Sequence, residues 1–309
     1  MKVKLFTHTD LDGVGCAIIG KLAFPTIDVE YCDYDNVNEK IAKYVYDEEY
    51  KNYSTTFITD ISVDKTVATM IDNAYTSSNE FVLLDHHKTA LWLNEYQWAE
   101  VREIYEDTCG DLKTSGTWMF YKDILLFYIS ENYSLLEDAN SFVEIVRQYD
   151  TWEWKTKYNN IIPKQVNDLM HLLGREVFIK SVLDELKMSK EYKLTEDNLS
   201  LLIRNQEKID SYIDSKDKSI IVKEINGYQA GVVFAERYSS ELGNKLSEAH
   251  PELDFIAIIN PSFSVSYRTV KDIDLGLIAK VYGGGGHPKA SGSPIDNDMR
   301  NKIIDLLFS

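Results

Sequence analysis

Cysteine is scarce in this sequence, and the spacing of its few cysteines is not typical of a disulfide framework or a metal site. Among 309 residues there are only 3, Cys16, Cys32 and Cys109, and none of them forms a C-x-x-C pair. An odd number without that spacing argues against a disulfide framework and against a zinc site built from thiolates. A reducing cytoplasm is the compartment that best fits this usage.

Long hydrophobic runs are also missing. No stretch approaches the roughly 20 apolar residues that a membrane span requires, and the opening residues 1–5 enter a strand pattern rather than the pattern of a signal peptide. We therefore expect a soluble cytoplasmic protein without a membrane partner. The length allows two domains, each able to bury a core of its own.

Basic residues are outnumbered by acidic ones. The chain has 33 Lys and Arg against 50 Asp and Glu, a formal net charge of -17. Duplex DNA is therefore not an expected partner, because binding its phosphate backbone over a broad surface requires a basic face on the protein. Bound divalent cations could still hold a polyanionic substrate locally, since they reverse the field of carboxylates. Solubility alone would also explain the acidity.

Strand and helix patterns alternate in the first part of the chain. Apolar runs predict strands at 3–6, 27–31, 56–59 and 81–84, and helical patterns occupy 17–24, 37–46 and 65–75. The last strand is apolar throughout, as expected when both faces are covered. This alternation predicts an α/β fold with a mostly parallel sheet flanked by helices.

The pattern becomes helical between about 114 and 215, and a polar run at 214–218 is expected to be a linker. We therefore expect one domain over 1–213, with a helical extension, and a second over 219–309. The second domain is predicted to be a smaller α+β module. It has a two-residue hairpin signal at Asn226-Gly227, a glycine-rich loop at 283–292 and a terminal helix.

Polar side chains stand at the ends of three of the predicted strands. They are His8, Asp10, Asp12, Asp60, Asp85, His86 and His87. Open α/β sheets place their ligands at the carboxyl ends of the strands, so these groups should share one crevice. Asp150 follows a helical pattern at 135–149, where a carboxylate opposes the helix dipole unless a cation is near. Small residues at 115–117 would let a helix end approach the crevice, although an ordinary cap explains them equally well.

The chemistry that needs such a set is phosphoryl displacement assisted by two divalent cations. Two ions can clamp the attacking and leaving oxygens, and one carboxylate usually bridges them. The candidate ligands are His8, Asp10, Asp12, Asp60, His86 and Asp150. Because thiolates are absent and imidazole is present, Mn²⁺ is the first choice and Mg²⁺ the second.

These motifs resemble those of the DHH/DHHA1 phosphoesterases. The resemblance is carried by His8-x-Asp10-x-Asp12-Gly13, by Asp60, by Asp85-His86-His87 and by Gly284-Gly285-Gly286-His287-x-x-Ala290-x-Gly292. The opening segment is most similar to the oligoribonuclease branch, which is also described as a branch of cyclic-nucleotide phosphodiesterases. The middle, about 123–215, matches nothing apart from Asp150. The resemblance implies a catalytic DHH domain, 1–213, and a substrate-binding DHHA1 domain, 219–309.

The resemblance also implies roles for single residues. One cation would be held by His8, Asp10 and Asp60, and the other by Asp12, Asp60, His86 and Asp150, with Asp60 as the bridge. Asp138 or Asp123 remains an alternative to Asp150.

Outside the ligand set, Asp85 would orient the histidines, and His87 would contact the phosphate or act as general acid. Arg268 and the loop residues Gly284, Gly285, Gly286 and His287 would bind the substrate phosphate or nucleotide.

The activity implied is hydrolysis of short single-stranded oligonucleotides to nucleoside 5′-monophosphates. Alternatives that share the motifs are a 3′,5′-bisphosphate nucleotide phosphatase and a cyclic mono- or dinucleotide phosphodiesterase. A pyrophosphatase would need a basic second domain, and a nucleotide-sensing binding protein would lack some ligands. Tyr149, Trp152 and Trp154 could stack on bases, although packing roles explain them as well. Oligomeric state and the choice between RNA and DNA stay open.

Overall fold

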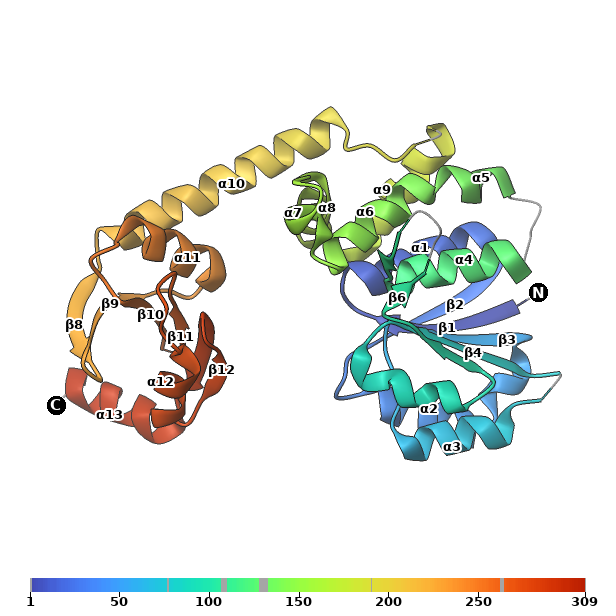
Figure 1. Ribbon diagram of the computed structural model, residues 1–309, viewed down its shortest axis with the longest axis horizontal. Coiled ribbons are helices and arrows are strands. Elements are labelled where there is room, and N and C mark those ends of the chain that lie inside the picture. The colour runs from blue at the N-terminus through green and yellow to red at the C-terminus, as the bar shows by residue number, and fades with distance from the viewer. Residues whose placement is uncertain are drawn as a thin grey trace. The chain divides into compact units, whose positions relative to one another are not determined.

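The computed structural model describes residues 2–76, 78–106, 110–127, 133–189, 191–261 and 264–308. The chain divides into two units, Met1–Leu202 and Ile203–Ser309 (Figure 1). In the ranges just given, no helix combines the length and the apolar character that crossing a membrane would require.

A parallel sheet forms the centre of the first unit. Its strands are β1 (Lys2–His8), β2 (Thr26–Cys32), β3 (Thr55–Thr59), β4 (Glu80–Asp85) and β5 (Ala99–Val101). They lie in the order β2-β1-β3-β4-β5, and every neighbouring pair is parallel. This confirms the expected α/β fold. The register pairs Thr7 with Thr59 and Thr59 with Leu84, so β1, β3 and β4 end along one edge.

Helices cover both faces of this sheet (Figure 1). On one face, α2 (Val37–Tyr46) and α3 (Lys65–Ala74) share a buried cluster with Phe6 of β1. On the other, α1 (Leu11–Ala23) and α4 (Gly116–Phe127) pack on Leu5. Adjacent residues of β1 thus face opposite cores, as in a strand covered on both sides. In α1 every residue except Lys21 is buried.

Further helices extend the layer formed by α1 and α4. They are α5 (Tyr133–Asp138), α6 (Asn140–Asp150), α7 (Glu153–Thr156), α8 (Ile162–Leu173) and α9 (Arg175–Met188). The remaining short elements of the unit are the 3₁₀ helices η1 (Glu49–Asn52) and η2 (Lys88–Glu95) and the strand pair β6 (Ile104–Tyr105) and β7 (Leu112–Lys113). Phe142 and Phe178 bury α6 and α9 in the same core as α1.

Helix α10 (Glu196–Asp217) runs across the division between the two units. Leu202 belongs to the core of the first unit, while Ile209 and Ile213 are buried in a core of the second. The segment expected as a linker, 214–218, therefore forms the last turn of α10 and the residue after it. A polar run continues a helix here because the apolar residues before it already anchor that helix to the second unit.

The second unit is built on a mixed six-stranded sheet in the order β12-β13-β11-β10-β9-β8. Its strands are β8 (Ile221–Ile225), β9 (Tyr228–Phe234), β10 (Phe255–Asn260), β11 (Ser264–Arg268), β12 (Gly285–His287) and β13 (Ala290–Pro294). Its helices are α11 (Ser239–Ala249), α12 (Leu275–Val281) and α13 (Asn297–Phe308). Asn226 and Gly227 both have positive φ, 52° and 83°, as a two-residue hairpin turn requires.

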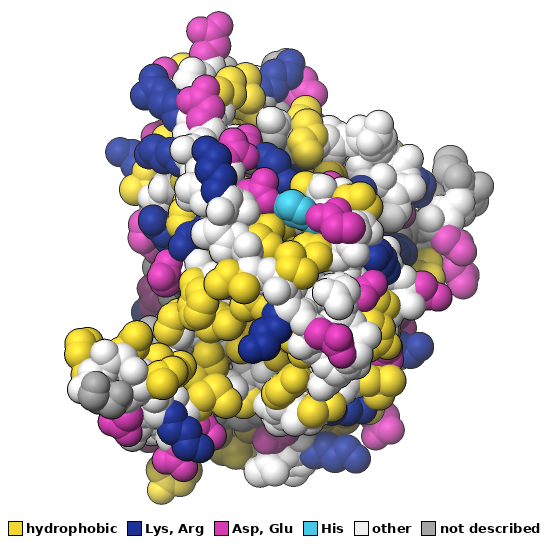
Figure 2. Space-filling view, turned by 90° about the vertical axis from the view of Figure 1, so that its left-hand side faces the viewer, with side chains coloured by type: hydrophobic (Ala, Val, Ile, Leu, Met, Phe, Trp, Pro, Cys, Tyr) yellow, Lys and Arg dark blue, Asp and Glu magenta, His cyan; other side chains and the backbone are white. Residues whose placement is uncertain are grey.

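Two features of this unit are not among the predictions made from the sequence. The expected glycine loop contains a β-hairpin, because β12 pairs antiparallel with β13. The unit also presents apolar side chains on its surface (Figure 2). Its exposed large apolar residues are carried mainly by β8, β9, α12 and α13, and α13 has no buried residue.

Candidate metal centre

The turn from β1 into α1 places the first polar groups. Asp10 caps α1, and its Oδ1 accepts a hydrogen bond of 3.1 Å from the Gly13 amide. A Cβ on Gly13 would lie 2.2 Å from the carbonyl oxygen of His8. The motif therefore needs glycine at position 13, because the helix begins directly against the strand that carries His8.

Three side chains form a first group of possible metal ligands, His8, Asp10 and Asp60, whose donor atoms all lie within 4.8 Å of one another. His8 Nδ1 is 2.9 Å from Asp10 Oδ2 and 3.9 Å from Asp60 Oδ2. The short contact with Asp10 is not aligned as a hydrogen bond, so His8 Nδ1 has no hydrogen-bond partner among the described residues.

A second group of the same kind consists of Asp12, His86 and Asp150. His86 Nε2 lies 3.7 Å from Asp12 Oδ2 and 3.4 Å from Asp150 Oδ2. It is also 3.3 Å from Asp60 Oδ1. Asp60 thus turns one oxygen toward each group. Of the alternatives to Asp150, neither Asp123 nor Asp138 belongs to any such group among the described residues.

Asp60 is held in an unusual backbone conformation. It follows β3, is 1 % exposed and has a φ of 58°, a region that asparagine and aspartate enter more readily than other side chains. Its amide donates a hydrogen bond of 3.0 Å to the carbonyl of Leu84, which continues the pairing of β3 with β4.

The N-terminus of α4 fixes Asp12. The amides of Gly116 and Thr117 donate to the Asp12 carboxylate at 2.5 and 2.9 Å, and the Thr117 hydroxyl donates to the Asp12 carbonyl at 2.6 Å. A helix N-terminus favours an anion at this place. The small residues at 115–117 thus do bring a helix end to the crevice.

Asp85 links the two histidines that follow it. Its Oδ1 accepts from the amide of His86 at 2.8 Å and lies 2.7 Å from His87 Nδ1, while the Ser62 hydroxyl donates to Oδ2. His87 Nε2 is 3.4 Å from the hydroxyl of Tyr34. The sequence reasoning overlooked Tyr34; its position just beyond the end of β2 was the available signal.

Crowding of carboxylates sets the electrostatics of the centre. Burial, followed by the charges of Asp12 and Asp10, raises the pKa of Asp60 well above its ordinary value and the pKa of Asp150 to about 8. Burial also lowers the pKa of His86. For Asp10, burial is outweighed by the contact with His8, which lowers its pKa to about 2. Such a cluster favours bound cations.

The donor atoms fit divalent cations. Asp60 Oδ2 and His86 Nε2 are enclosed and have no hydrogen-bond partner among the described residues, which leaves their lone pairs free for other ligation. The donors are oxygen and imidazole nitrogen without thiolate, a set that suits Mn²⁺ or Mg²⁺. Asp60 belongs to the first group and turns Oδ1 to within 3.3 Å of His86 Nε2 in the second, an arrangement that matches a pair of ions bridged by one carboxylate.

The predicted substrate-binding residues lie in the second unit. Arg268 and His287 are both cross-strand neighbours of Ala290, so they stand at the same end of the sheet. Arg268 donates to the Ser240 hydroxyl at 3.1 Å. The glycines serve strand packing as well: a Cβ on Gly284 would lie 2.0 Å from the carbonyl oxygen of Gly292, and Gly286 has a φ of 135°.

Comparison with known proteins now assigns the chain to a family. It is 37% identical over 311 residues to oligoribonuclease NrnB of Bacillus subtilis, and the match covers 98% of this chain and 75% of that protein. The chain belongs to the DHH-family, NrnB-like phosphoesterases. No protein-family model matches it. A 3′,5′-cyclic-nucleotide phosphodiesterase of Helicobacter pylori is 21% identical, with 96% of this chain and 93% of that protein covered.

Solved structures show the same fold. Exonuclease RecJ bound to manganese matches with a TM-score of 0.53 and 12% identity, over 98% of this chain and 88% of that one. A pGpG-specific phosphodiesterase, PggH of Vibrio cholerae, matches with a TM-score of 0.52 and 12% identity, over 99% and 97%. These neighbours show that the chain has the DHH fold, and its membership of the family, shown by the Bacillus subtilis relative, makes it a metal-dependent phosphoesterase.

Proposed function

We propose that the protein is a manganese-dependent phosphodiesterase that hydrolyses short single-stranded oligonucleotides to nucleoside 5′-monophosphates in the cytoplasm. The observation that carries this proposal is the position of Asp60, whose two oxygens face different groups of ligands. The name of the Bacillus subtilis relative supports the substrate class. Cys16 and Cys32, which are free and buried, suit a reducing compartment.

The ligands divide into two sets around Asp60. His8, Asp10 and Asp60 would hold one Mn²⁺, and Asp12, Asp60, His86 and Asp150 would hold the other. Bound there, the pair of ions supplies Lewis acidity, a lowered pKa for water and neutralisation of charge on the phosphoryl oxygens. The chain's own contribution is to keep these side chains in place before substrate binds, through the α4 amides on Asp12 and the β3–β4 pairing at Asp60.

His87 is the group best placed to move a proton. Asp85 holds its Nδ1 at 2.7 Å, which leaves Nε2 directed toward Tyr34. From Nε2, His87 donates the proton that the leaving ribose oxygen needs, and Asp85 stabilises the charged ring before the transfer. Asp85 itself is buried and touches no substrate in this scheme.

The second unit would hold the end of the substrate. Arg268 offers a forked donor for phosphate, and His287 stands at the same end of that sheet, with Gly284, just before β12, and Gly285 and Gly286, within β12, leading to it. In the first unit, Trp152 is 55% exposed and its ring lies 5.4 Å from that of Trp154, beside Asp150. Such rings would stack on unpaired bases without sequence preference.

The test is turnover of a panel by the wild type and by Asp60→Asn, with Asp184→Asn as the matched control. The panel contains two- to five-mer oligonucleotides, cyclic mono- and dinucleotides, a 3′,5′-bisphosphate nucleotide and pyrophosphate. With Mn²⁺ present, we expect 5′-mononucleotides from the oligonucleotides, identified by mass. Asp60→Asn should abolish turnover and weaken Mn²⁺ binding, whereas Asp184 is exposed on α9 and its substitution should change neither.

Retained Mn²⁺-dependent hydrolysis in Asp60→Asn would refute the bridging role. Faster turnover of a cyclic nucleotide than of any oligonucleotide would favour the second candidate, a cyclic-nucleotide phosphodiesterase, which the Helicobacter pylori relative supports. If the 3′,5′-bisphosphate nucleotide were hydrolysed fastest, the protein would be a nucleotide phosphatase. Binding of nucleotides without any turnover would make the protein a sensor.

A further inference from the structure

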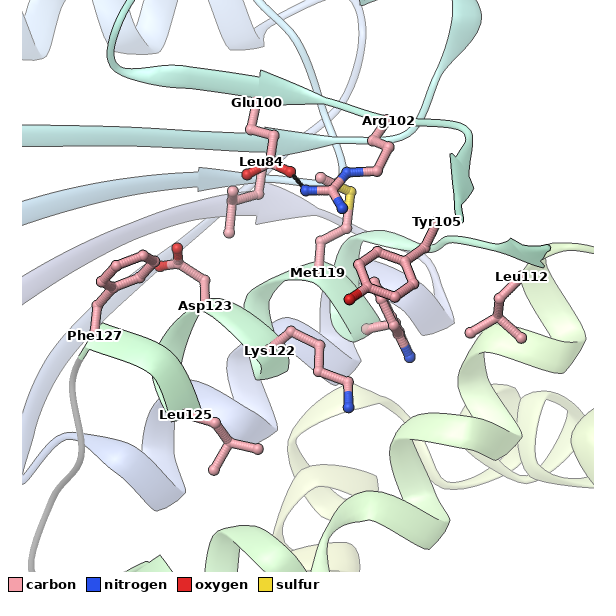
Figure 3. A pocket seen from close by; sticks show the side chains of 11 residues that line it. Leu84, Glu100, Arg102, Tyr105, Leu112, Met119, Lys122, Asp123, Leu125 and Phe127 are labelled. Carbon is pink, nitrogen blue, oxygen red and sulfur yellow. Dashed lines mark ion pairs between the residues drawn. The ribbon is translucent and has the colours of Figure 1, made fainter. Parts of the chain in front are cut away.

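A cavity of about 490 Å³ lies in the first unit between α4, the residue after β5 and strand β6 (Figure 3). Asp123, Arg102, Lys122 and Tyr105 are among the residues that border it, and none of the described lining residues belongs to the ligand groups of the metal centre. Its volume is in the range of small-molecule sites, roughly 300–1,000 Å³. This space has no role in the proposed reaction.

Asp123 is half-buried, and one of its carboxylate oxygens lacks a donor. Its Oδ2 is enclosed and has no hydrogen-bond partner in the part of the chain that the structure describes. Burial, together with the charge of Glu80, raises the pKa of Asp123 to about 6. An enclosed polar oxygen without a partner is destabilising, so proteins rarely keep one without a reason. A ligand that donates hydrogen bonds to this carboxylate, once the side chain turns its oxygens into the cavity that it lines, would supply the reason.

Aromatic and basic side chains border the same cavity. On α4, Trp118 and Lys122 are four residues apart and share a face, and Met119 and Asp123 form the neighbouring row that also borders the cavity. The Trp118 ring is 5.1 Å from that of Tyr105. Lys122 Nζ lies 5.6 Å from the Trp118 ring, and Arg102 Cζ lies 5.2 Å from the Tyr105 ring. Arg102 also pairs with Glu100.

We propose that this cavity is a binding site for a guanine nucleotide, separate from the metal centre. Among the common bases, guanine presents two adjacent N–H donors on its Watson–Crick edge, and a carboxylate offers two acceptor oxygens side by side. Asp123 would accept both donors, Tyr105 would face the purine, and Arg102 and Lys122 would attract the phosphate. An arginine of a partner protein has a similar pair of donors, but these two basic residues would repel it.

Helix α4 connects this site with the metal centre. Its first amides, those of Gly116 and Thr117, hold Asp12, and its later residues border the cavity. A ligand on α4 therefore binds the same rigid element that fixes a catalytic carboxylate. The binding proposal itself does not depend on the oligonucleotide activity.

The test is calorimetric titration of the Mn²⁺-loaded protein with GMP, AMP and XMP, using wild type, Asp123→Asn and the control Asp184→Asn. We expect the wild type to bind GMP about 10-fold or more tightly than AMP, because AMP lacks the paired donors. Asp123→Asn should lose this preference and gain affinity for XMP, since an amide accepts from N1–H and donates to the 2-oxo group. A nucleotide that binds at the metal centre contributes the same binding heat in all three proteins, because neither substitution lies there.

Equal affinity of the wild type for GMP and AMP would overturn the proposal, whether or not the variant folds. So would unchanged GMP binding in Asp123→Asn, or loss of GMP binding in the control. If the wild type bound N-acetyl-arginine amide instead of GMP, and Asp123→Asn abolished that binding, the guanine-nucleotide proposal would be overturned in favour of a protein partner. A gain of XMP binding by Asp123→Asn would support it directly, because a merely disrupted pocket would bind neither nucleotide.

Discussion

Helix α4 approaches Asp60 so closely that position 116 admits no side chain. A Cβ on Gly116 would lie 2.5 Å from Asp60 Cβ and 2.9 Å from its Cα. Non-bonded carbons prefer roughly 3.5–4.0 Å, so Gly116→Ala must separate α4 from Asp60 by roughly 1 Å. The same amide donates to Asp12 at 2.5 Å. The substitution therefore moves two carboxylates relative to each other without changing either one.

A displacement of 1 Å in a catalytic constellation can reduce the rate by roughly 100-fold. Stability should change by less than the roughly 2.7 kcal/mol that a 100-fold loss of rate represents, because the overpacking cost of roughly 1–3 kcal/mol is partly offset by the higher helix propensity of alanine. We expect kcat of Gly116→Ala to fall about 100-fold, with a loss of unfolding free energy of at most about 2 kcal/mol.

The matched control is Gly20→Ala in α1. A Cβ there would meet the Cδ1 of Ile27 at 2.5 Å, which is the end of a flexible side chain that can rotate away. Mn²⁺-dependent hydrolysis of a dinucleotide and thermal unfolding would be measured for both variants. Wild-type kcat in Gly116→Ala, or an equal loss of kcat in Gly20→Ala, would refute the reasoning.

Three further outcomes are expected. Burial, with the charges of Asp12 and Asp10, raises the pKa of Asp150 to about 8, so the folded metal-free protein holds a proton that the unfolded chain loses near pH 4. Its melting temperature in EDTA should fall from pH 5 to pH 8, and Mn²⁺ affinity should rise over that range; flat profiles would contradict this. Tyr34→Phe removes the hydroxyl 3.4 Å from His87 Nε2, so kcat should fall roughly 2- to 12-fold at constant KM, and unchanged kinetics would exclude a role. Arg147→Met leaves buried Glu153 without its nearer partner, at 2.6 Å, and with only Lys157 at 3.5 Å, which should cost about 3 kcal/mol in urea unfolding, partly recovered by adding Glu153→Gln.

The sequence predicts the first unit well because its signals are local and repeated. Each strand of the parallel sheet ends at the edge where its polar residues follow, so His8, Asp60 and His86 could be brought together from strand patterns alone. That Asp150 joins these residues could be inferred only from its place at the end of a helix. A carboxylate there opposes the helix dipole unless a cation lies near it. The structure places His8 and Asp60 in one group of candidate ligands, and His86 and Asp150 in another.

Other features depend on tertiary contacts that no short pattern encodes. The amides of Gly116 and Thr117 reach Asp12 across more than a hundred residues of chain, and Tyr34 meets His87 from a loop after β2. The glycine segment becomes a hairpin because β13 offers it a partner strand. The polar run at 214–218 stays with α10 because the helix is anchored before it.

The nearly complete burial of α1 limits which parts of the metal centre can move. Only Lys21 of this helix reaches solvent, so its central amide protons should exchange with deuterium only when the whole unit unfolds. Asp12, in the first turn of this helix, should then keep its position throughout a catalytic cycle. Opening and closing around a substrate must come from exposed elements such as Tyr34, which is 62% accessible.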